Sequence, residues 1–309
     1  MKAARISAYK AQPVLEDASR PVIGAGEVLI RVAAAGLNPL DVKIQQGFMH
    51  DFFPVEFPYT LGTDLAGTIE QIGAGVTGWS IGDRVVARTN PPAGGAFAEL
   101  AMVPATHLVA LPTSVSFEQA AGIPTTAGTA SQALFEVAGL KSGQTVLIHA
   151  GAGGVGSFAI QLARNAGARV IATASGDGIA IARRLGADQV IDYKAQAFED
   201  LVSDVNVVLD TVGGDTQQRS FGVLRRGGQL VATPSPPDEA LAMEHGVDAS
   251  FVFHQSDAAR LAKLIEQVAA GELTVLIDRT VPFSQFDAAF AYQASGRARG
   301  KIIVQGANS

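Results

Sequence analysis

Hydrophobic positions follow two different spacings along the chain. Up to about residue 115, short apolar or alternating runs are separated by glycine and proline turns, which is typical of β-strands. These runs predict strands within 27–35, 68–72, 82–87 and 97–103. Because the strands are short and the turns frequent, the pattern favours a barrel-like or irregular β domain.

From about residue 116 the apolar spacing lengthens to that of helices, and strands then alternate with helices. Pro124 separates two predicted helices, at 117–121 and 128–138. Strands that alternate with helices imply right-handed crossovers and a parallel, doubly wound sheet. The strands of this region are predicted at 169–174, 189–191, 205–210, 229–233 and 249–253, and its helices at 179–185, 197–202 and 216–224. The remaining elements are predicted as a helix at 257–270, a strand at 275–281, a helix at 286–294 and a strand at 301–304.

One stretch between these regions carries a specific chemical signal. An apolar strand at 145–148 enters a glycine-rich turn, and helical spacing begins at Gly154. Gly151, Gly153 and Gly156 fit the G-x-G-x-x-G pattern, in which a helix N-terminus and backbone N–H groups hold a pyrophosphate. The alternative is a glycine turn of the kind found in any α/β protein. Because strand, turn and helix follow in the required order, we predict a dinucleotide site.

Composition narrows the class of partner. The chain has 309 residues, enough for two domains, with 48% hydrophobic and 17% charged residues. Its net charge of −6 gives no electrostatic reason to expect a nucleic acid or an anionic membrane as partner. The sequence has neither an apolar run of transmembrane length nor the apolar core of a signal peptide at its start. We therefore expect a cytoplasmic protein.

Cysteine is absent, which excludes disulfides, thiolate nucleophiles and a cysteine-ligated zinc site. The five histidines have no metal-ligand spacing. We therefore expect no bound metal.

Several segments together resemble the medium-chain dehydrogenase/reductase superfamily, in its zinc-free quinone oxidoreductase (zeta-crystallin-like) and enone reductase branch. The resemblance covers essentially the whole chain. The segments that carry it, in the order of the family, are GLNPLDVK at 36–43, PYTLGTDLAG at 58–67, GDRV at 82–85, PTTAGTA at 124–130, the glycine turn and GKIIV at 300–304.

The resemblance implies an α/β protein with a GroES-like catalytic domain over 1–115 and 256–309, and a Rossmann domain over 116–255. Substrate and nicotinamide would meet in a cleft between the domains. In zinc-dependent relatives, Asn38 would be a cysteine ligand and Thr63 a histidine ligand. Zinc alcohol dehydrogenase chemistry is thus a disfavoured alternative, because the chain has no cysteine for the remaining ligand position. Polar side chains and backbone N–H groups would have to stabilise a developing oxyanion in place of the metal.

Three residues are the catalytic candidates that this resemblance implies. Asn38 would donate to a carbonyl oxygen or hold the nicotinamide ribose, Lys43 would lie near ribose and substrate, and Thr126 would contact the nicotinamide end. Their alternatives are a turn residue before proline, a solvated lysine and a helix cap, respectively. Relatives carry a tyrosine where Phe53 precedes Pro54, so solvent is the expected proton source.

The end of the second Rossmann strand bears on the choice of nucleotide. Ser175 stands where enzymes that use NAD carry an acidic residue, and Tyr193 matches a tyrosine that relatives use against a 2′-phosphate. The basic residue that usually follows the serine is missing, and Asp177 would repel a phosphate. We expect NADPH, with NADH as the alternative. The other implied cofactor contacts are Gly151, Ala152, Gly153, Gly154, Val155, Asp210, Thr211, Val212, Thr233, Phe251, Phe253 and Lys301.

The expected function is the reduction of quinones or α,β-unsaturated carbonyls by hydride transfer in a homodimer. The alternative is an NADPH-binding, crystallin-like structural or sensor protein with little turnover.

Overall fold

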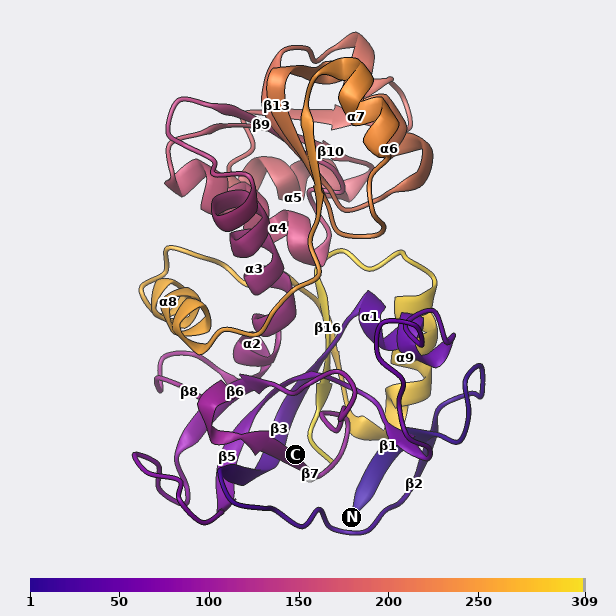
Figure 1. Ribbon diagram of the computed structural model, residues 1–309. Helices are drawn as coiled ribbons and strands as arrows, with labels where there is room; N and C mark the ends of the chain where they lie inside the picture. Colours follow the sequence, from indigo (N-terminus) through magenta and orange to yellow (C-terminus); the bar gives the residue numbers. More distant parts are fainter. Residues whose placement is uncertain (308–309) are drawn as a thin grey trace. The chain divides into compact units, whose positions relative to one another are not determined.

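The computed structural model describes residues 1–307, which form two compact units (Figure 1). The first unit contains Met1–Thr125 and the chain from Ser256 onward, and the second contains Thr126–Gln255. The sequence placed the first boundary at residue 115. Helix α2 (Phe117–Ala121) lies on strands β3 (Glu27–Leu37) and β5 (Asp64–Ile72), so residues 116–125 lie in the first unit.

The first unit is built on two β-sheets. Its larger sheet is seven-stranded in the order β15-β16-β3-β5-β6-β8, with β7 also paired to β3, and the smaller one has the order β2-β1-β4. Strand β3 is long and buried over most of its length because its sequence is nearly all apolar. The other strands of this unit are β1 (Lys2–Ile6), β2 (Val14–Asp17), β4 (Tyr59–Thr60), β6 (Arg84–Arg88), β7 (Leu100–Pro104), β8 (Val109–Ala110), β15 (Ile277–Val281) and β16 (Lys301–Gln305).

Strand β16 joins the two ends of the chain within this unit. It pairs antiparallel with β3, so that Ile302 lies opposite Leu37. Helix α1 (Pro39–Gln45) begins directly after β3, and α9 (Phe286–Ala294) contacts α1. The remaining helix of this unit is α8 (Ala258–Ala269).

The second unit contains a six-stranded, fully parallel sheet in the order β11-β10-β9-β12-β13-β14. This is the strand order of a doubly wound dinucleotide-binding fold, and it confirms the predicted parallel sheet. The order reverses between β9 and β12, and ligands of such sheets bind at the carboxyl ends of the strands at this point. The strands are β9 (Thr145–Ile148), β10 (Arg169–Ala174), β11 (Gln189–Asp192), β12 (Val205–Asp210), β13 (Leu224–Ala232) and β14 (Asp248–Phe251). The α-helices are α3 (Pro124–Ser131, which begins in the first unit), α4 (Gly154–Asn165), α5 (Asp177–Leu185), α6 (Gly214–Ser220) and α7 (Glu239–His245).

Two helix predictions were wrong. The helix predicted at 117–121 has those bounds, but the one predicted at 128–138 begins four residues earlier, at Pro124, since a proline in the first turn removes only an N–H that has no helical partner. That helix continues as a π-helix over Gln132–Val137. The helix predicted at 197–202 is a single 3-10 turn, Phe198–Asp200, a form that is frequent in short connections between other elements.

No helix among the described residues has the length and apolar character needed to span a membrane.

Candidate functional site

The glycine turn has the backbone geometry that a pyrophosphate site requires. A Cβ atom on Gly156 would overlap the backbone oxygen of Ala150, so only glycine lets α4 start this close to the end of β9. Gly153 is the N-cap of α4, and a Cβ there would lie 3.2 Å from the same oxygen. A side chain at Gly153 would occupy space at the start of the helix, where unpaired N–H groups attract a phosphate, and so would hinder the approach of that phosphate. The residues predicted to contact the pyrophosphate, 151–155, comprise the end of this turn and the first two residues of α4.

Substitution at Gly156 provides a test of this geometry. Gly156→Ala should lower the free energy of unfolding by about 1–3 kcal/mol and weaken dinucleotide binding, because the overlap with Ala150 forces the turn and helix apart. Urea unfolding and fluorescence titration with a dinucleotide measure the two effects. Gly222→Ala is the matched control, since no atom lies within 4 Å of a Cβ added there. Equal behaviour of the two variants would contradict this account of the turn.

A buried polar network fixes the start of the turn. Ala150 has a positive φ of 51°, which is uncommon for a residue with a Cβ. Its N–H donates to Thr173 Oγ1 at 3.2 Å, and the N–H of Gly151 donates to the Thr173 backbone oxygen at 2.8 Å. His149 Nδ1 lies 3.2 Å from Thr173 Oγ1, and its Nε2 lies 2.9 Å from Ser220 Oγ. The network holds Ala150 in the conformation that the turn needs.

His149 is a neutral structural group in this network. Its side chain is buried, and burial lowers its pKa from 6.5 to about 4, partly opposed by the nearby Asp210 carboxylate. The ring also packs edge-on against Phe198, with 4.7 Å between the ring centroids. A buried, neutral imidazole at a strand end accounts for this residue without a catalytic role.

The predicted contacts beyond the glycine turn lie at the carboxyl ends of neighbouring strands. Asp210, at the end of β12, accepts hydrogen bonds on Oδ1 from the N–H groups of Val212 and Gly213, both at 2.9 Å. Its Oδ2 accepts from Gln217 Nε2 at 3.0 Å, so this carboxylate holds the loop after β12. Thr211 Oγ1 donates to the backbone oxygen of His149 at 2.8 Å, which ties that loop to the glycine turn.

The remaining residues predicted on this edge follow β13 and β14. Thr233 donates its N–H to the backbone oxygen of Asp210 at 3.0 Å, and Phe251 ends β14. Phe253 and Val212 are partly exposed, with 36% and 51% of their surfaces accessible. Thr126 is buried in the first turn of α3. Apart from Thr126 on α3, these predicted residues lie at or just after the carboxyl ends of β12, β13 and β14, as the switch-point rule requires.

The adenosine end of the predicted site lies where β10 and β11 finish. Ala174 is in register with Asp192, which sets the next residues of the two strands side by side. Ser175 Oγ lies 3.1 Å from Tyr193 OH and donates to it. The sequence named both residues as ribose or phosphate contacts, and the structure brings their hydroxyl groups together at the surface.

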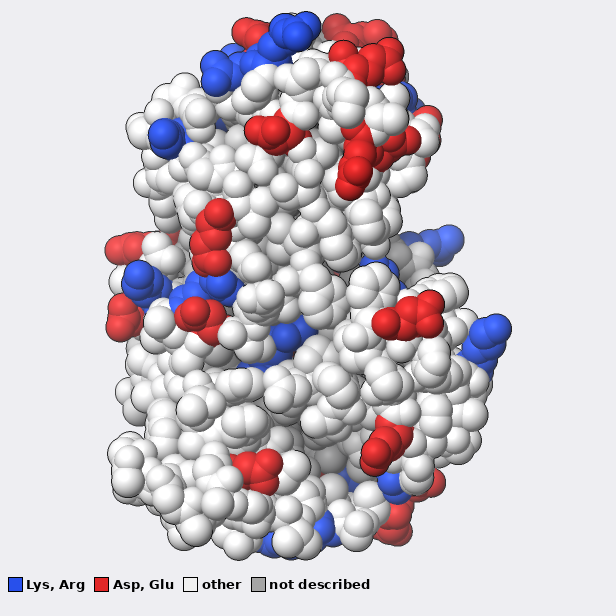
Figure 2. Space-filling view, in the orientation of Figure 1, with Lys and Arg blue, Asp and Glu red and all other residues white. Residues whose placement is uncertain are grey.

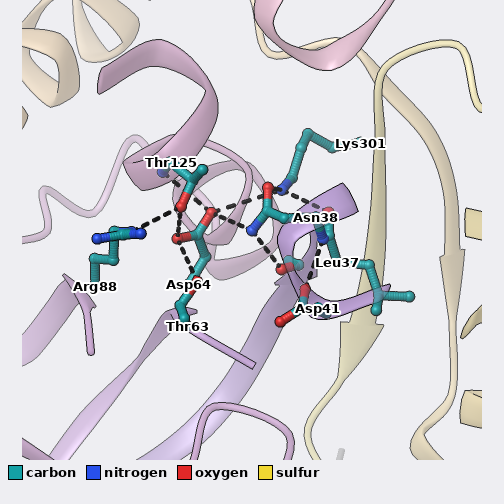
Figure 3. Close-up of polar contacts among 9 residues, drawn as sticks. Leu37, Asn38, Asp41, Thr63, Asp64, Arg88, Thr125 and Lys301 are labelled. Carbon is teal, nitrogen blue, oxygen red and sulfur yellow. Dashed lines mark hydrogen bonds and ion pairs between the residues drawn. The ribbon is translucent and has the colours of Figure 1, made fainter. Parts of the chain in front are cut away.

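The first unit contains a buried polar cluster around Asp64, shown in Figure 3. Asp64 is fully buried; its Oδ1 accepts from Thr125 Oγ1 at 2.6 Å, and its Oδ2 accepts from the Thr125 N–H at 3.1 Å and from Asn38 Nδ2 at 3.0 Å. Lys301 Nζ donates to Asn38 Oδ1 at 2.6 Å and to the Leu37 backbone oxygen at 2.8 Å, and lies 3.6 Å from Asp64 Oδ2. We call Asn38, Asp64, Arg88, Thr125 and Lys301 the Asp64 cluster.

Arg88 completes the cluster from strand β6. Its Nε donates to Thr125 Oγ1 at 3.0 Å, and its Nη1 donates to Ser256 Oγ at 3.1 Å. Burial lowers the pKa of Arg88, and the Asp64 and Asp41 carboxylates oppose that shift. The guanidinium therefore contributes a second positive charge beside the Asp64 carboxylate.

Two residues that the sequence predicted as ligand contacts, Asn38 and Lys301, are members of this cluster. The Asn38 side chain already donates to Asp64 and accepts from Lys301, so its amide is held in place by charged neighbours. Lys301, predicted as a cofactor contact, is buried in the first unit, and burial lowers its pKa. Their direct contact with a ligand remains a prediction. Lys43 lies half-buried on α1, and burial lowers its pKa as well.

Asp41 lies next to the cluster in the first turn of α1. Its Oδ2 accepts the Asn38 N–H at 2.8 Å, while its Oδ1 is buried and has no hydrogen-bond partner. Burial raises the pKa of Asp41 to about 7, with the nearby Asp64 charge adding to the shift. A proton on Oδ1 would relieve the burial of charge at this unpartnered oxygen.

Sequence reasoning missed Asp64, Arg88 and Thr125 as site residues. A signal was present for two of them, because Asp64 precedes the apolar residues 65–66 and Arg88 directly follows the apolar run 85–87 of a predicted strand. Thr125 lies in the quoted PTTAGTA segment but carries no distinctive chemistry by itself.

The side chains of this cluster are suited to binding the ammonium group of Lys301 rather than a metal ion. Within residues 1–307, no group of three or more His, Cys, Asp or Glu side chains could hold a metal ion. Asn38 and Thr63, which the resemblance equates with zinc ligands, offer an amide and a hydroxyl group. The Asn38 oxygen is already bound by the Lys301 ammonium, whose charge would repel a metal cation.

Comparison with known proteins assigns the chain to a family. Residues 24–113 match the family model described as the alcohol dehydrogenase GroES-like domain, and residues 185–304 match that of a zinc-binding dehydrogenase. The chain is 34% identical to the chloroplast envelope quinone oxidoreductase homolog of Arabidopsis thaliana, over 92% of this chain and 91% of that protein. It is also 34% identical to the NADPH-dependent alkenal/one oxidoreductase of the same plant, over 98% and 79%.

Solved structures agree with this assignment. The quinone oxidoreductase of Coxiella burnetii superposes with a TM-score of 0.93 at 33% identity, covering 99% of each chain. The Escherichia coli quinone oxidoreductase, solved with NADPH, superposes with a TM-score of 0.89 at 26% identity, covering 99% of this chain and 100% of that one. These matches confirm the predicted GroES-like domain and Rossmann sheet. The chain belongs to the medium-chain dehydrogenase/reductase superfamily, among the quinone oxidoreductases and enone reductases.

Proposed function

We propose that this protein is a cytoplasmic, homodimeric, NADPH-dependent reductase of quinones or α,β-unsaturated carbonyls that works without a bound metal. The observation that carries the proposal is the glycine turn, where Gly156 leaves space that no other residue would leave and α4 presents its amino end. Relatives named as quinone and alkenal/one oxidoreductases support the substrate class.

The residues present fit a pyridine dinucleotide. The segment 151–155 would hold the pyrophosphate by main-chain N–H groups, and the hydroxyls of Ser175 and Tyr193 would hold the 2′-phosphate on the adenosine ribose. When bound, NADPH supplies a hydride that passes from its nicotinamide ring to the electrophilic carbon of the substrate.

The residues of the chain would contribute mainly by position and charge. Asp210 orders the loop after β12, and Thr211 links that loop to the glycine turn. The Asp64 cluster fixes the Asn38 amide, which donates to Asp64 Oδ2 at 3.0 Å and to the Gly36 backbone oxygen at 3.3 Å and accepts from Lys301 Nζ at 2.6 Å. The cluster would therefore contribute through the fixed positive charges of Lys301 and Arg88, because preorganised charge stabilises a developing oxyanion without a metal ion.

The surface charge supports a small molecule rather than a nucleic acid as partner, and an open edge of the Rossmann sheet supports a homodimer. On the face shown in Figure 2, acidic and basic residues are interspersed, without a broad basic surface of the kind that binds nucleic acid. Strand β14 lies at the edge of the Rossmann sheet, so it has backbone groups free for pairing with a second copy. Light scattering of the purified protein tests the dimer.

The decisive experiment is stopped-flow oxidation of NADPH with a panel of quinones and enones. We expect turnover with at least one substrate class, unchanged after treatment with a metal chelator. Absence of turnover across the panel despite tight NADPH binding would instead favour the crystallin-like alternative, and loss of activity on chelation would contradict the metal-free mechanism.

A further inference from the structure

The Ser175–Tyr193 pair has no basic residue on the β10 side, and the backbone explains why. Gly176 has φ 54° and ψ −134°, a conformation that residues with a side chain rarely adopt. A Cβ on Gly178 would lie 3.1 Å from the Ala152 Cβ atom of the glycine turn, which leaves little room for a long side chain. The residue between them is Asp177. A cation that holds a 2′-phosphate at this pair must therefore come from elsewhere.

The β11 side offers a cation at the next residue after Tyr193. Lys194 is exposed, and among residues 1–307 its ammonium group has no hydrogen bond or ion pair. Its backbone is fixed, because its N–H donates to Asp192 Oδ1 at 3.0 Å. The N–H groups of Ala195 and Gln196 both donate to the Asp192 backbone oxygen at 3.0 Å, which closes a tight turn.

This turn holds Lys194 beside the hydroxyl pair. The Tyr193 N–H donates to the Ala174 backbone oxygen at 3.2 Å, so the end of β11 is tied to the end of β10. The other basic residues near this end of the sheet are less suitable, since Arg183 and Arg184 lie in the last turn of α5, away from its start at Asp177. The flexible four-carbon stem of lysine lets its ammonium reach a phosphate set on the two hydroxyls.

We propose that Lys194 is the residue that makes the site prefer NADPH over NADH, by pairing with the 2′-phosphate that Ser175 and Tyr193 hold. The inference rests on the proposed function and adds to it the source of the positive charge. The cation comes after β11 because the three positions that follow Ser175 are Gly176, Asp177 and Gly178, none of which carries a positive charge.

Binding measurements test the inference without turnover. Dissociation constants for NADPH and NADH, and for the fragments adenosine 2′,5′-bisphosphate and AMP, are measured by calorimetry on the whole protein and on Lys194→Gln. Loss of one charge-assisted hydrogen bond should weaken both 2′-phosphate ligands about tenfold and leave NADH and AMP within about twofold. Lys141→Gln is the matched control, an exposed lysine of the same unit at the amino end of β9, and should bind all four ligands like wild type.

The remaining outcomes distinguish a failure of the proposed function from a failure of the inference. A wild-type protein that binds neither dinucleotide would overturn the proposed function itself. A wild-type protein that prefers NADH would overturn the inference and leave the oxidoreductase function standing. A Lys194→Gln variant that keeps its NADPH affinity would also overturn the inference, as would one whose affinities for NADPH and NADH fall by the same factor.

Discussion

Lys301→Met is expected to lower the free energy of unfolding by about 3–5 kcal/mol, the largest effect predicted for a single substitution here. Lys301 and Asp64 are almost completely buried, with side-chain exposures of 2% and 0%. Removing Lys301 leaves the Asp64 carboxylate with a weaker compensating charge in a medium of low dielectric constant, because Arg88 bonds to the Thr125 hydroxyl that lies between it and Asp64. The substitution also leaves the Leu37 backbone oxygen and Asn38 Oδ1 without their donor. Urea unfolding at neutral pH measures the loss.

Two further variants separate the cluster from a general effect of removing lysine. Lys2→Met removes a lysine from an ion pair in the same unit, 2.9 Å from Asp17, but with side-chain exposures of 53% and 78%. Solvent screens that pair, so its loss should lower the stability far less than the loss of Lys301 does. Adding Asp64→Asn to Lys301→Met should restore part of the stability, because the unpaired charge disappears. A Lys301→Met variant as stable as Lys2→Met would show that the buried pair does not stabilise the fold.

The parallel sheet could be predicted closely, because its strands are buried on both faces. Such strands appear as continuous apolar runs, and the bounds 169–174 and 205–210 were predicted as the structure has them. Strand β1 was missed because its sequence, KAARI, mixes charged and small residues. Helix α1 was missed although Asn38, Pro39 and Asp41 form an N-terminal capping pattern, because only seven residues follow the cap.

The candidate site was predictable where its signal is local and not where it depends on distant pairing. The glycine turn is contained in one short stretch, and the structure places that stretch between β9 and α4. By contrast, Lys301 meets Asn38 across 263 residues of sequence, and periodicity gives no information about such a contact. Ser175 and Tyr193 are an intermediate case, since parallel strands that neighbour each other finish at the same edge.

Stability below neutral pH should depend on His149. Its pKa in the folded protein is lowered to about 4, against 6.5 in the unfolded chain, so the unfolded state binds a proton at higher pH than the folded state does. The stability that this neutral imidazole contributes is therefore fully present above about pH 6.5 and is lost as the pH falls toward 4. This contribution should fall by about 2 kcal/mol between pH 7 and pH 5. Asp41, whose pKa burial raises to about 7, changes the stability in the opposite direction over the same range, so the His149 contribution is measured as the difference between wild type and a variant without the imidazole. Urea unfolding of both proteins across this range, followed by circular dichroism, gives that difference.

His149→Gln isolates this contribution, because a glutamine amide does not titrate while it retains groups that can hydrogen-bond to Thr173 and Ser220. The variant is expected to start less stable at pH 7 and to lose about 2 kcal/mol less than wild type between pH 7 and pH 5. His245→Gln, which removes a half-buried histidine from α7 of the same unit, should keep the wild-type profile. If His149→Gln and wild type lose stability in parallel, the imidazole is not held neutral in the fold. The hydrogen bonds to Thr173 and Ser220 would then have to accommodate an imidazolium, which donates at both nitrogens, and the network that fixes Ala150 would be organised by charge rather than by burial.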